Sequence, residues 1–186
     1  MVLPFFPDKK SSPAALGKLE KFSDKTAVLV KPKIIKISRI LTEDVVLAAP
    51  PGIGKQQLIE FLVDRLRERK GLADPGLLAR VLEREQGIST TLDTGLSLPH
   101  GRTDSMKNIV AALALVPGGI VDPSAGGLTI NLMFLFVSSN RPEMLPLHLQ
   151  LLRAVASLFR PELIARLAAV ADPAAAMDAI RKAEAS

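Results

Sequence analysis

The sequence contains only two histidines, and one of them, His100, lies in the segment GLSLPHGRTD at residues 95–104. Pro99 restricts the backbone entering His100 and Gly101 permits a sharp turn after it, so we expect the imidazole to be exposed at the end of a strand. A neutral imidazole is a competent nucleophile near pH 7. If it accepted a phosphoryl group, Arg102, the backbone N–H groups of the turn at Gly101 and a nearby helix N-terminus could bind the negative charge. From these residues alone, a structural histidine in a turn is the favoured interpretation.

The second histidine, His148, lies among leucines in the segment MLPLHLQLL. Its ring could pack beside the core, or it could point into the same site as His100 and bind the phosphoryl group or orient the first ring. Two histidines in a chain without cysteine do not indicate a metal site. Ser97, His100 and Asp104 do not indicate a catalytic triad, because no nucleophile elbow accompanies them.

A second segment, APPGIGKQQL at residues 49–58, superficially resembles a nucleotide-binding loop. Ala49 stands where the loop needs its first glycine, and Gln56 stands where it needs a metal-binding hydroxyl. The apolar segment at residues 132–140 also ends in Ser-Ser-Asn, without the acidic residue that such a protein requires. We therefore interpret this segment as a Pro/Gly turn that leads into a helix beginning near Lys55.

The segments that must position these side chains alternate between helix and strand patterns. Apolar residues at helical spacing predict helices at residues 55–71, 73–87, 141–159, 161–171 and 172–185. Strands are predicted at residues 33–38, 44–47, 94–100, 108–117 and 128–139, the last as a central strand covered on both faces, and residues 116–127 are predicted to form a Gly/Pro-rich loop. Helices between strands indicate an α/β layered domain.

Local signals mark the ends of several helices. Gly71 and Gly87 are expected to terminate the first two helices, and Asp74 is expected to cap the second, with Pro75 at its first position. An Asp-Pro pair at Asp172 opens the last helix in the same way.

Composition indicates one globular domain. The chain has 186 residues, of which 48% are hydrophobic, and it has no cysteine and therefore no disulfide. No apolar segment approaches the roughly 18 residues of a membrane span. The N-terminal segment MVLPFFPDKK lacks the charge order of a signal peptide. We expect a cytoplasmic protein without membrane insertion.

Positive charge is concentrated at the N-terminus. Residues 1–39 contain nine Lys/Arg and three acidic residues, whereas the rest of the chain has 15 basic and 16 acidic residues. We interpret residues 1–34 as a basic N-terminal extension and residues 35–186 as the domain. The extension could contact nucleic acid or an acidic partner, but a solvated extension is the simpler interpretation, so nucleic-acid binding is not expected.

The segments REQGIST and GLSLPHGRTD together resemble the active-site signature of the IIA domain of the phosphoenolpyruvate-dependent sugar phosphotransferase system, mannitol/fructose type. The nitrogen-regulatory version of that domain is the more similar one. A second landmark of this family, a histidine followed by leucine early in a helix, is matched by His148, and KISRILTEDVVL resembles the usual opening of the domain. The resemblance covers about residues 35–186. The matching positions of the first signature are Arg84, Glu85, Ser89, Thr90, Gly95, Pro99 and His100.

The resemblance implies a fold and a function. The fold is a mixed β-sheet flanked by helices. His100 would be phosphorylated by a phosphohistidine carrier protein, HPr or its nitrogen-system paralogue, and His148 would bind the phosphoryl group beside it, with Arg84 nearby. We also expect Thr90, Gly101 and Arg102 to contribute to phosphoryl binding. No cofactor or metal is implied, because the phosphoryl donor is a protein; a IIB component or a regulated protein is a possible further partner.

Two features keep alternatives open. The approach to the histidine is TTLDTG, in which only Gly95 remains of the family's usual glycine-rich segment, and Arg84 could also be a surface residue near a helix end. The chain contains no transporter or IIB segment, which favours a regulatory protein of the nitrogen branch over a sugar-uptake component. A non-catalytic IIA-like binding module is the other alternative.

Overall fold

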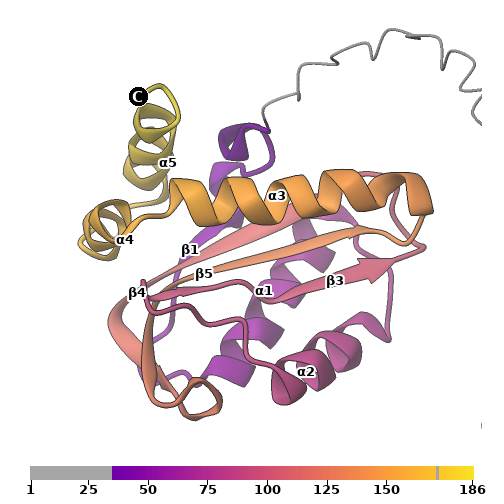
Figure 1. The fold of residues 1–186 in the computed structure, drawn as a ribbon, viewed down its shortest axis with the longest axis horizontal. Coiled ribbons are helices and arrows are strands. Elements are labelled where there is room, and N and C mark those ends of the chain that lie inside the picture. Colours follow the sequence, from indigo (N-terminus) through magenta and orange to yellow (C-terminus); the bar gives the residue numbers. More distant parts are fainter. Residues whose placement is uncertain (1–34, 171) are drawn as a thin grey trace, which may run out of the picture. The chain divides into compact units, whose positions relative to one another are not determined.

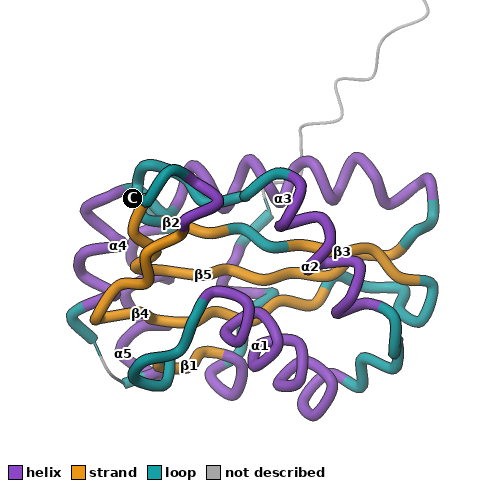
Figure 2. Tube along the Cα trace, turned by 90° about the horizontal axis from the view of Figure 1, so that it is seen from below, coloured by secondary structure: helices purple, strands orange, loops and turns teal. Residues whose placement is uncertain are grey.

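The computed structural model describes residues 35–170 and 172–186, and the predicted N-terminal extension lies outside these residues. The strands of the described part are β1 (Val46–Ala48), β2 (Leu96–Ser97), β3 (His100–Thr103), β4 (Val110–Asp122) and β5 (Leu128–Ser139). They form a mixed β-sheet in the order β1-β4-β5-β2, with β3 also paired to β5 (Figure 2). β1 pairs parallel to β4, β4 pairs antiparallel to β5, and both β2 and β3 pair parallel to β5.

Helices cover both faces of this sheet. The helices are α1 (Lys55–Lys70), α2 (Leu77–Gly87), α3 (Leu145–Leu158), α4 (Pro161–Ala168) and α5 (Pro173–Ala183), and short 3-10 turns occur at Ile37–Arg39, Glu43–Val45, Pro123–Ala125 and Pro142–Met144. α1 and α2 lie on one face and α3 on the other, while α4 and α5 pack against each other at one end (Figure 1). The α/β architecture and the flanked mixed sheet predicted from the sequence are therefore confirmed.

The core follows from the central position of β5. Every residue of β5 from 132 to 139 is buried, because this strand has neighbours on both edges and helices on both faces. α1 contributes a buried face at helical spacing: Leu58, Ile59, Leu62, Val63 and Leu66. The prediction of a central strand at residues 128–139 is confirmed, as is the prediction that a Pro/Gly turn leads into a helix at Lys55.

Two predicted strands differ in extent: residues 44–45 belong to a 3-10 turn before β1, and the strand predicted at 94–100 is divided into β2 and the first residue of β3. Two further predicted elements have a different conformation. Residues 35–38 do not form a strand. Ile37 and Ser38 lie in the 3-10 turn at Ile37–Arg39, and their backbone N–H groups donate to the carboxylate of Glu184 instead of to a neighbouring strand. The Gly/Pro-rich segment from residue 116 is not wholly a loop. β4 continues through it to Asp122, with an irregularity of the register between Leu115 and Ile120 that accommodates the glycines.

Two predictions of helix ends are confirmed and one is wrong. Gly71 terminates α1 in the left-handed conformation, and the carboxylate of Asp172 caps α5, as expected. Asp74 does not cap α2, which begins only at Leu77. Its carboxylate accepts the N–H of Gly76 in a tight turn and binds two side chains further along the chain.

Within the described residues, no helix has the length and apolar character needed to span a membrane.

Candidate active site

The two histidines predicted to share a site lie side by side. His100 is the first residue of β3, and His148 lies near the start of α3. Their ring centroids are 5.1 Å apart, with the planes inclined by 58°. Phe136 of β5 packs against both rings, stacking on His100 at 5.1 Å and lying 5.0 Å from His148. The parallel pairing of β3 with β5 and the return of the chain through α3 bring the histidines together.

The contacts of His100 define which ring nitrogen is free to react. Nδ1 lies 2.8 Å from the carbonyl oxygen of Leu98, and because a carbonyl only accepts, Nδ1 carries the proton. Nε2 therefore presents a lone pair, and the Arg84 guanidinium contacts it. Burial lowers the pKa of His100, and the Arg84 cation lowers it further, against the opposing effect of the Leu98 carbonyl. The ring is thus neutral at pH 7.

The expectation that the His100 side chain is exposed is wrong. The residue lies at the start of β3, but it is only 7% exposed. Gly101 likewise does not turn the chain; it is paired with Val137 inside the strand. A Cβ at Gly101 would come within 2.7 Å of Leu77 and 2.9 Å of Val81, both on α2. Glycine is required here because α2 packs closely over the strand.

His148 is buried and held by a hydroxyl. Its Nδ1 lies 2.7 Å from Oγ of Ser138, which leaves Nε2 as the atom available to a ligand. Burial is the main cause that lowers the pKa of His148 to about 4, and the neighbouring His100, Arg102 and Arg84 add to the shift. The second ring is therefore neutral at pH 7 as well.

The two predicted arginines lie at the site in different ways. Arg84 extends from the last turn of α2 and contacts His100 directly. The Nε and Nη2 groups of Arg102 each donate to the carbonyl oxygen of Ser139 at 3.1 Å, and Nη2 also donates to that of Arg141. Arg102 therefore ties β3 to the segment that leads into α3, and only its remaining N–H groups are available to a ligand.

Thr90 does not line the histidine pocket. Its backbone N–H and its hydroxyl both donate to the carboxylate of Glu85, the hydroxyl at 2.7 Å. Thr90 thus stabilises the segment after α2 and is not part of the pocket lining.

The histidines open into a pocket of about 430 Å³, which we call the histidine pocket. Arg80 and Asn140 line it and were missed in the sequence. Arg80 lies one helical turn before Arg84, and that spacing was a usable signal. Ser138 had no such signal, because its contact with His148 depends on how α3 lies over β5. The lining residues are Arg80, Arg84, His100, Gly101, Arg102, Asn140 and His148. Within the described ranges, no three residues among His, Asp and Glu are grouped so that they could hold a metal ion.

The site thus contains a neutral imidazole with a free Nε2 beside a second histidine and an arginine. The sequence also matches a known protein family. Residues 39–183 match the family described as "Phosphoenolpyruvate-dependent sugar phosphotransferase system, EIIA 2". The chain belongs to this family. The resemblance inferred from the two histidine segments is thereby confirmed.

Individual relatives of this EIIA protein agree with the family. A nitrogen regulatory protein of Bradyrhizobium diazoefficiens is 26% identical over 131 residues, covering 70% of this chain and 84% of the relative. The crystal structure of nitrogen regulatory protein IIA-Ntr from Neisseria meningitidis superposes with a TM-score of 0.64 at 23% identity, over 77% of this chain and 98% of that one. Enzyme IIAMTL in its complex with phosphorylated enzyme IIBMTL from Escherichia coli gives a TM-score of 0.64 at 18% identity, over 76% and 97% of the two chains. The fold of these structures is shared.

Proposed function

We propose that this EIIA protein accepts a phosphoryl group on Nε2 of His100 from an HPr-like phosphocarrier protein. The observation that carries the proposal is the fixed proton on Nδ1: the Leu98 carbonyl holds it, so the lone pair is on Nε2, beside the Arg84 guanidinium. The lowered pKa of His100 keeps that lone pair free of a proton at pH 7.

The transfer step follows from these contacts. The Nε2 lone pair attacks the phosphorus of the donor's phosphohistidine, and a new N–P bond forms as the donor's N–P bond breaks. The electron pair of the broken bond returns to the donor ring, which leaves neutral if its other nitrogen is protonated. His100 keeps its Nδ1 proton, so its phosphorylated ring is cationic, and the Leu98 carbonyl stabilises that charge. The Arg84 guanidinium moves from Nε2 to the phosphoryl oxygens, where its planar donors match the developing charge.

His148 completes the site as a donor to the phosphoryl group. Nδ1 of His148 lies 2.7 Å from the Ser138 hydroxyl, and we assign the hydroxyl as the donor in this contact, which places the proton of the neutral ring on Nε2. An Nε2–H group donates to an oxygen without adding a second positive charge. The low pKa of His148 keeps its ring neutral over the physiological pH range.

A protein donor fits the surroundings better than a small molecule does. Leu145, Leu147 and Leu149 flank His148 and are 43%, 37% and 48% exposed. Exposed leucines beside a reactive group are suited to the apolar centre of a protein interface. We place the protein in a nitrogen-regulatory branch because the relative from Bradyrhizobium diazoefficiens is named a nitrogen regulatory protein. A IIB-type acceptor, as in the enzyme IIAMTL complex, is the alternative destination of the phosphoryl group.

The test is reconstitution. Purified protein is incubated with phosphoenolpyruvate, enzyme I and the HPr-like carrier, and intact mass and phosphorus NMR are recorded. We expect one acid-labile phosphoryl group, bonded to Nε2, in the wild type. His100→Ala should carry none, whereas His148→Ala should acquire it slowly. An unlabelled wild type with an active carrier would replace this proposal with the alternative of a non-catalytic IIA-like binding module.

A further inference from the structure

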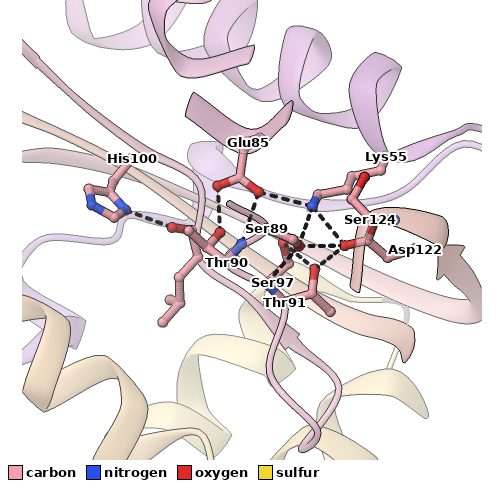
Figure 3. Close-up of polar contacts among 10 residues, drawn as sticks. Lys55, Glu85, Ser89, Thr90, Thr91, Ser97, His100, Asp122 and Ser124 are labelled. Atoms are coloured by element: carbon pink, nitrogen blue, oxygen red, sulfur yellow. Dashed lines mark hydrogen bonds and ion pairs between the residues drawn. The ribbon is translucent and has the colours of Figure 1, made fainter. Parts of the chain in front are cut away.

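A buried cluster of charged side chains lies behind the histidine pocket. The ammonium of Lys55 lies 2.9 Å from the Glu85 carboxylate, 2.7 Å from the Asp122 carboxylate and 2.8 Å from the Ser89 hydroxyl (Figure 3). The side chains of Lys55, Glu85 and Asp122 are 12%, 5% and 0% exposed. We call these residues, with Ser89 and Thr91, the lysine cluster. None of them lines the histidine pocket.

Every strong donor and acceptor of the lysine cluster is paired. The three ammonium protons of Lys55 match its three acceptors. The Asp122 carboxylate also accepts from the hydroxyls of Ser89 and Thr91 and from the backbone N–H of Ser124. Glu85 uses its remaining capacity on Thr90. Three buried ions that are paired with one another and hydrogen-bonded to their neighbours hold their positions closely, because any displacement leaves a charge unpaired in an apolar surrounding.

The stability of α1 alone does not explain why a lysine occupies position 55. It is the first residue of α1, where the helix dipole disfavours a cation, and the first turn of α1 contains no acidic residue to offset it. The partners of Lys55 come from the last turn of α2, the segment after it and the end of β4. The lysine cluster therefore joins four separate segments of the chain at one point.

The lysine cluster connects to His100 by two routes. The first is α2 itself: Glu85 is adjacent to Arg84, so holding the Glu85 carboxylate fixes the rotation of this helix end and directs the Arg84 guanidinium to Nε2 of His100. The second route is a chain of hydrogen bonds. Glu85 accepts from Thr90 (Figure 3). The Thr90 carbonyl accepts from the N–H of Leu98 at 3.3 Å, and the Leu98 carbonyl accepts from Nδ1 of His100.

We propose that Lys55 is a positioning residue for His100: by holding Glu85 and Asp122 together, it sets both the arginine at Nε2 and the carbonyl at Nδ1, and so fixes the tautomer of the reactive ring. Without the ammonium, two buried carboxylates repel each other and the end of α2 separates from β4. Arg84 and the Thr90–Leu98 connection shift with it. The effect of Lys55 on phosphoryl transfer rests on the proposed function, whereas its effect on the tautomer does not.

The principal experiment measures the tautomer by nitrogen-15 NMR of the unphosphorylated protein. We expect His100 of the wild type to be protonated on Nδ1 alone. Lys55→Met should give a mixture of Nδ1–H and Nε2–H forms. Because that substitution leaves two unpaired carboxylates and can prevent folding, the neutral triple variant Lys55→Met/Glu85→Gln/Asp122→Asn is measured beside it. Lys70→Met, the same substitution at the other end of α1, is the matched control and should retain the wild-type signals.

Transfer kinetics provide the second measurement. In a folded lysine-cluster variant, kcat for phosphorylation by the carrier should fall roughly 10- to 100-fold, as expected for a displaced reactive group. KM for the carrier should not change, because the cluster lies away from the exposed leucines of α3. A folded variant that keeps the pure Nδ1–H tautomer would overturn the proposal, whatever its rate. If the wild type is never phosphorylated, the proposed function fails while the tautomer comparison still decides this inference.

Discussion

The histidine pocket and the lysine cluster are neighbouring polar groups with opposite properties. In the lysine cluster, the charges of Lys55, Glu85 and Asp122 are balanced by short contacts within the protein. In the histidine pocket, two neutral rings and the Arg84 guanidinium surround an open volume of about 430 Å³. The charges of the lysine cluster are paired within the protein, whereas the histidine pocket has a lone pair and cationic donors available to a ligand. The difference indicates that the first is built to hold position and the second to bind.

Substitutions in the two groups of residues should therefore have different effects on stability and on the rate of phosphoryl transfer. Substitutions in the lysine cluster should lower the free energy of unfolding, because they leave buried charge unpaired. Substitution of Arg84, which is exposed and faces the open histidine pocket, should lower the transfer rate with little effect on stability. Gly101 also lines this pocket, but α2 packs closely against it, so its substitution should affect stability as well.

Lys55→Met should lower the free energy of unfolding by about 3–5 kcal/mol, since two buried carboxylates lose their common partner. Asp122→Asn should cost less, because it leaves a one-to-one pair of Lys55 and Glu85. Lys70→Met should change stability by less than about 1 kcal/mol, as expected for a partly exposed pair. Urea denaturation followed by circular dichroism measures all three. Equal losses for Lys55→Met and Lys70→Met would contradict the comparison.

Arg84→Met should lower kcat for phosphorylation about 100-fold, because it removes a donor positioned at the transferring phosphoryl group. The free energy of unfolding should change by less than about 0.5 kcal/mol, since Arg84 is exposed. Rapid-quench measurement of phosphoryl transfer gives the rate, and Arg181→Met, at an exposed pair on α5, serves as control. A large stability loss with an unchanged rate would place Arg84 in the structural group instead.

Gly101→Ala should destabilise the protein by about 1–3 kcal/mol, because the added Cβ overlaps Leu77 and Val81 of α2. This helix carries Arg84 and Glu85, so the substitution should disturb both polar groups at once. Gly87→Ala is the matched control, since a Cβ there meets no atom within 4 Å. Thermal unfolding of the two variants decides the matter: similar melting temperatures would show that α2 does not pack as closely over β3 as described.

The pH dependence of stability should report on His148. Its native pKa of about 4 lies below the value of the unfolded chain, so from pH 6.5 down to pH 4 the unfolded state binds a proton that the native state does not. The contribution of His148 to the free energy of unfolding is fully present above pH 6.5. It should fall as the pH decreases, by at most about 1.4 kcal/mol per pH unit. His148→Gln should flatten the slope in urea denaturation between pH 4 and 7. An unaltered slope would mean that the ring titrates normally.

Much of the fold and part of the site could be predicted from sequence because the signals are local. The period of the apolar residues predicts α1 and β5, and the left-handed glycine at Gly71 and the Asp-Pro pair at Asp172 mark helix ends through backbone geometry alone. The strand expected at residues 33–38 failed in its described part because the carboxylate of Glu184, far away in the sequence, takes the backbone N–H groups. Asp74 failed as a helix cap for a similar reason, since Arg80 and Thr103 bind its carboxylate.

The sequence by itself determined the identity and spacing of His100, His148 and Arg84, and hence the kind of chemistry that the chain can perform. Only the tertiary structure decided that His100 is buried rather than displayed, that Nε2 rather than Nδ1 is free, and that Arg102 is largely occupied by backbone carbonyls. It also decided that Lys55 is buried between the Glu85 and Asp122 carboxylates, which the turn at residues 49–54 does not predict. The physical reason is that burial, tautomer and ion pairing depend on which segments meet in space. Residue type and spacing do not contain that information when the partners come from separate elements.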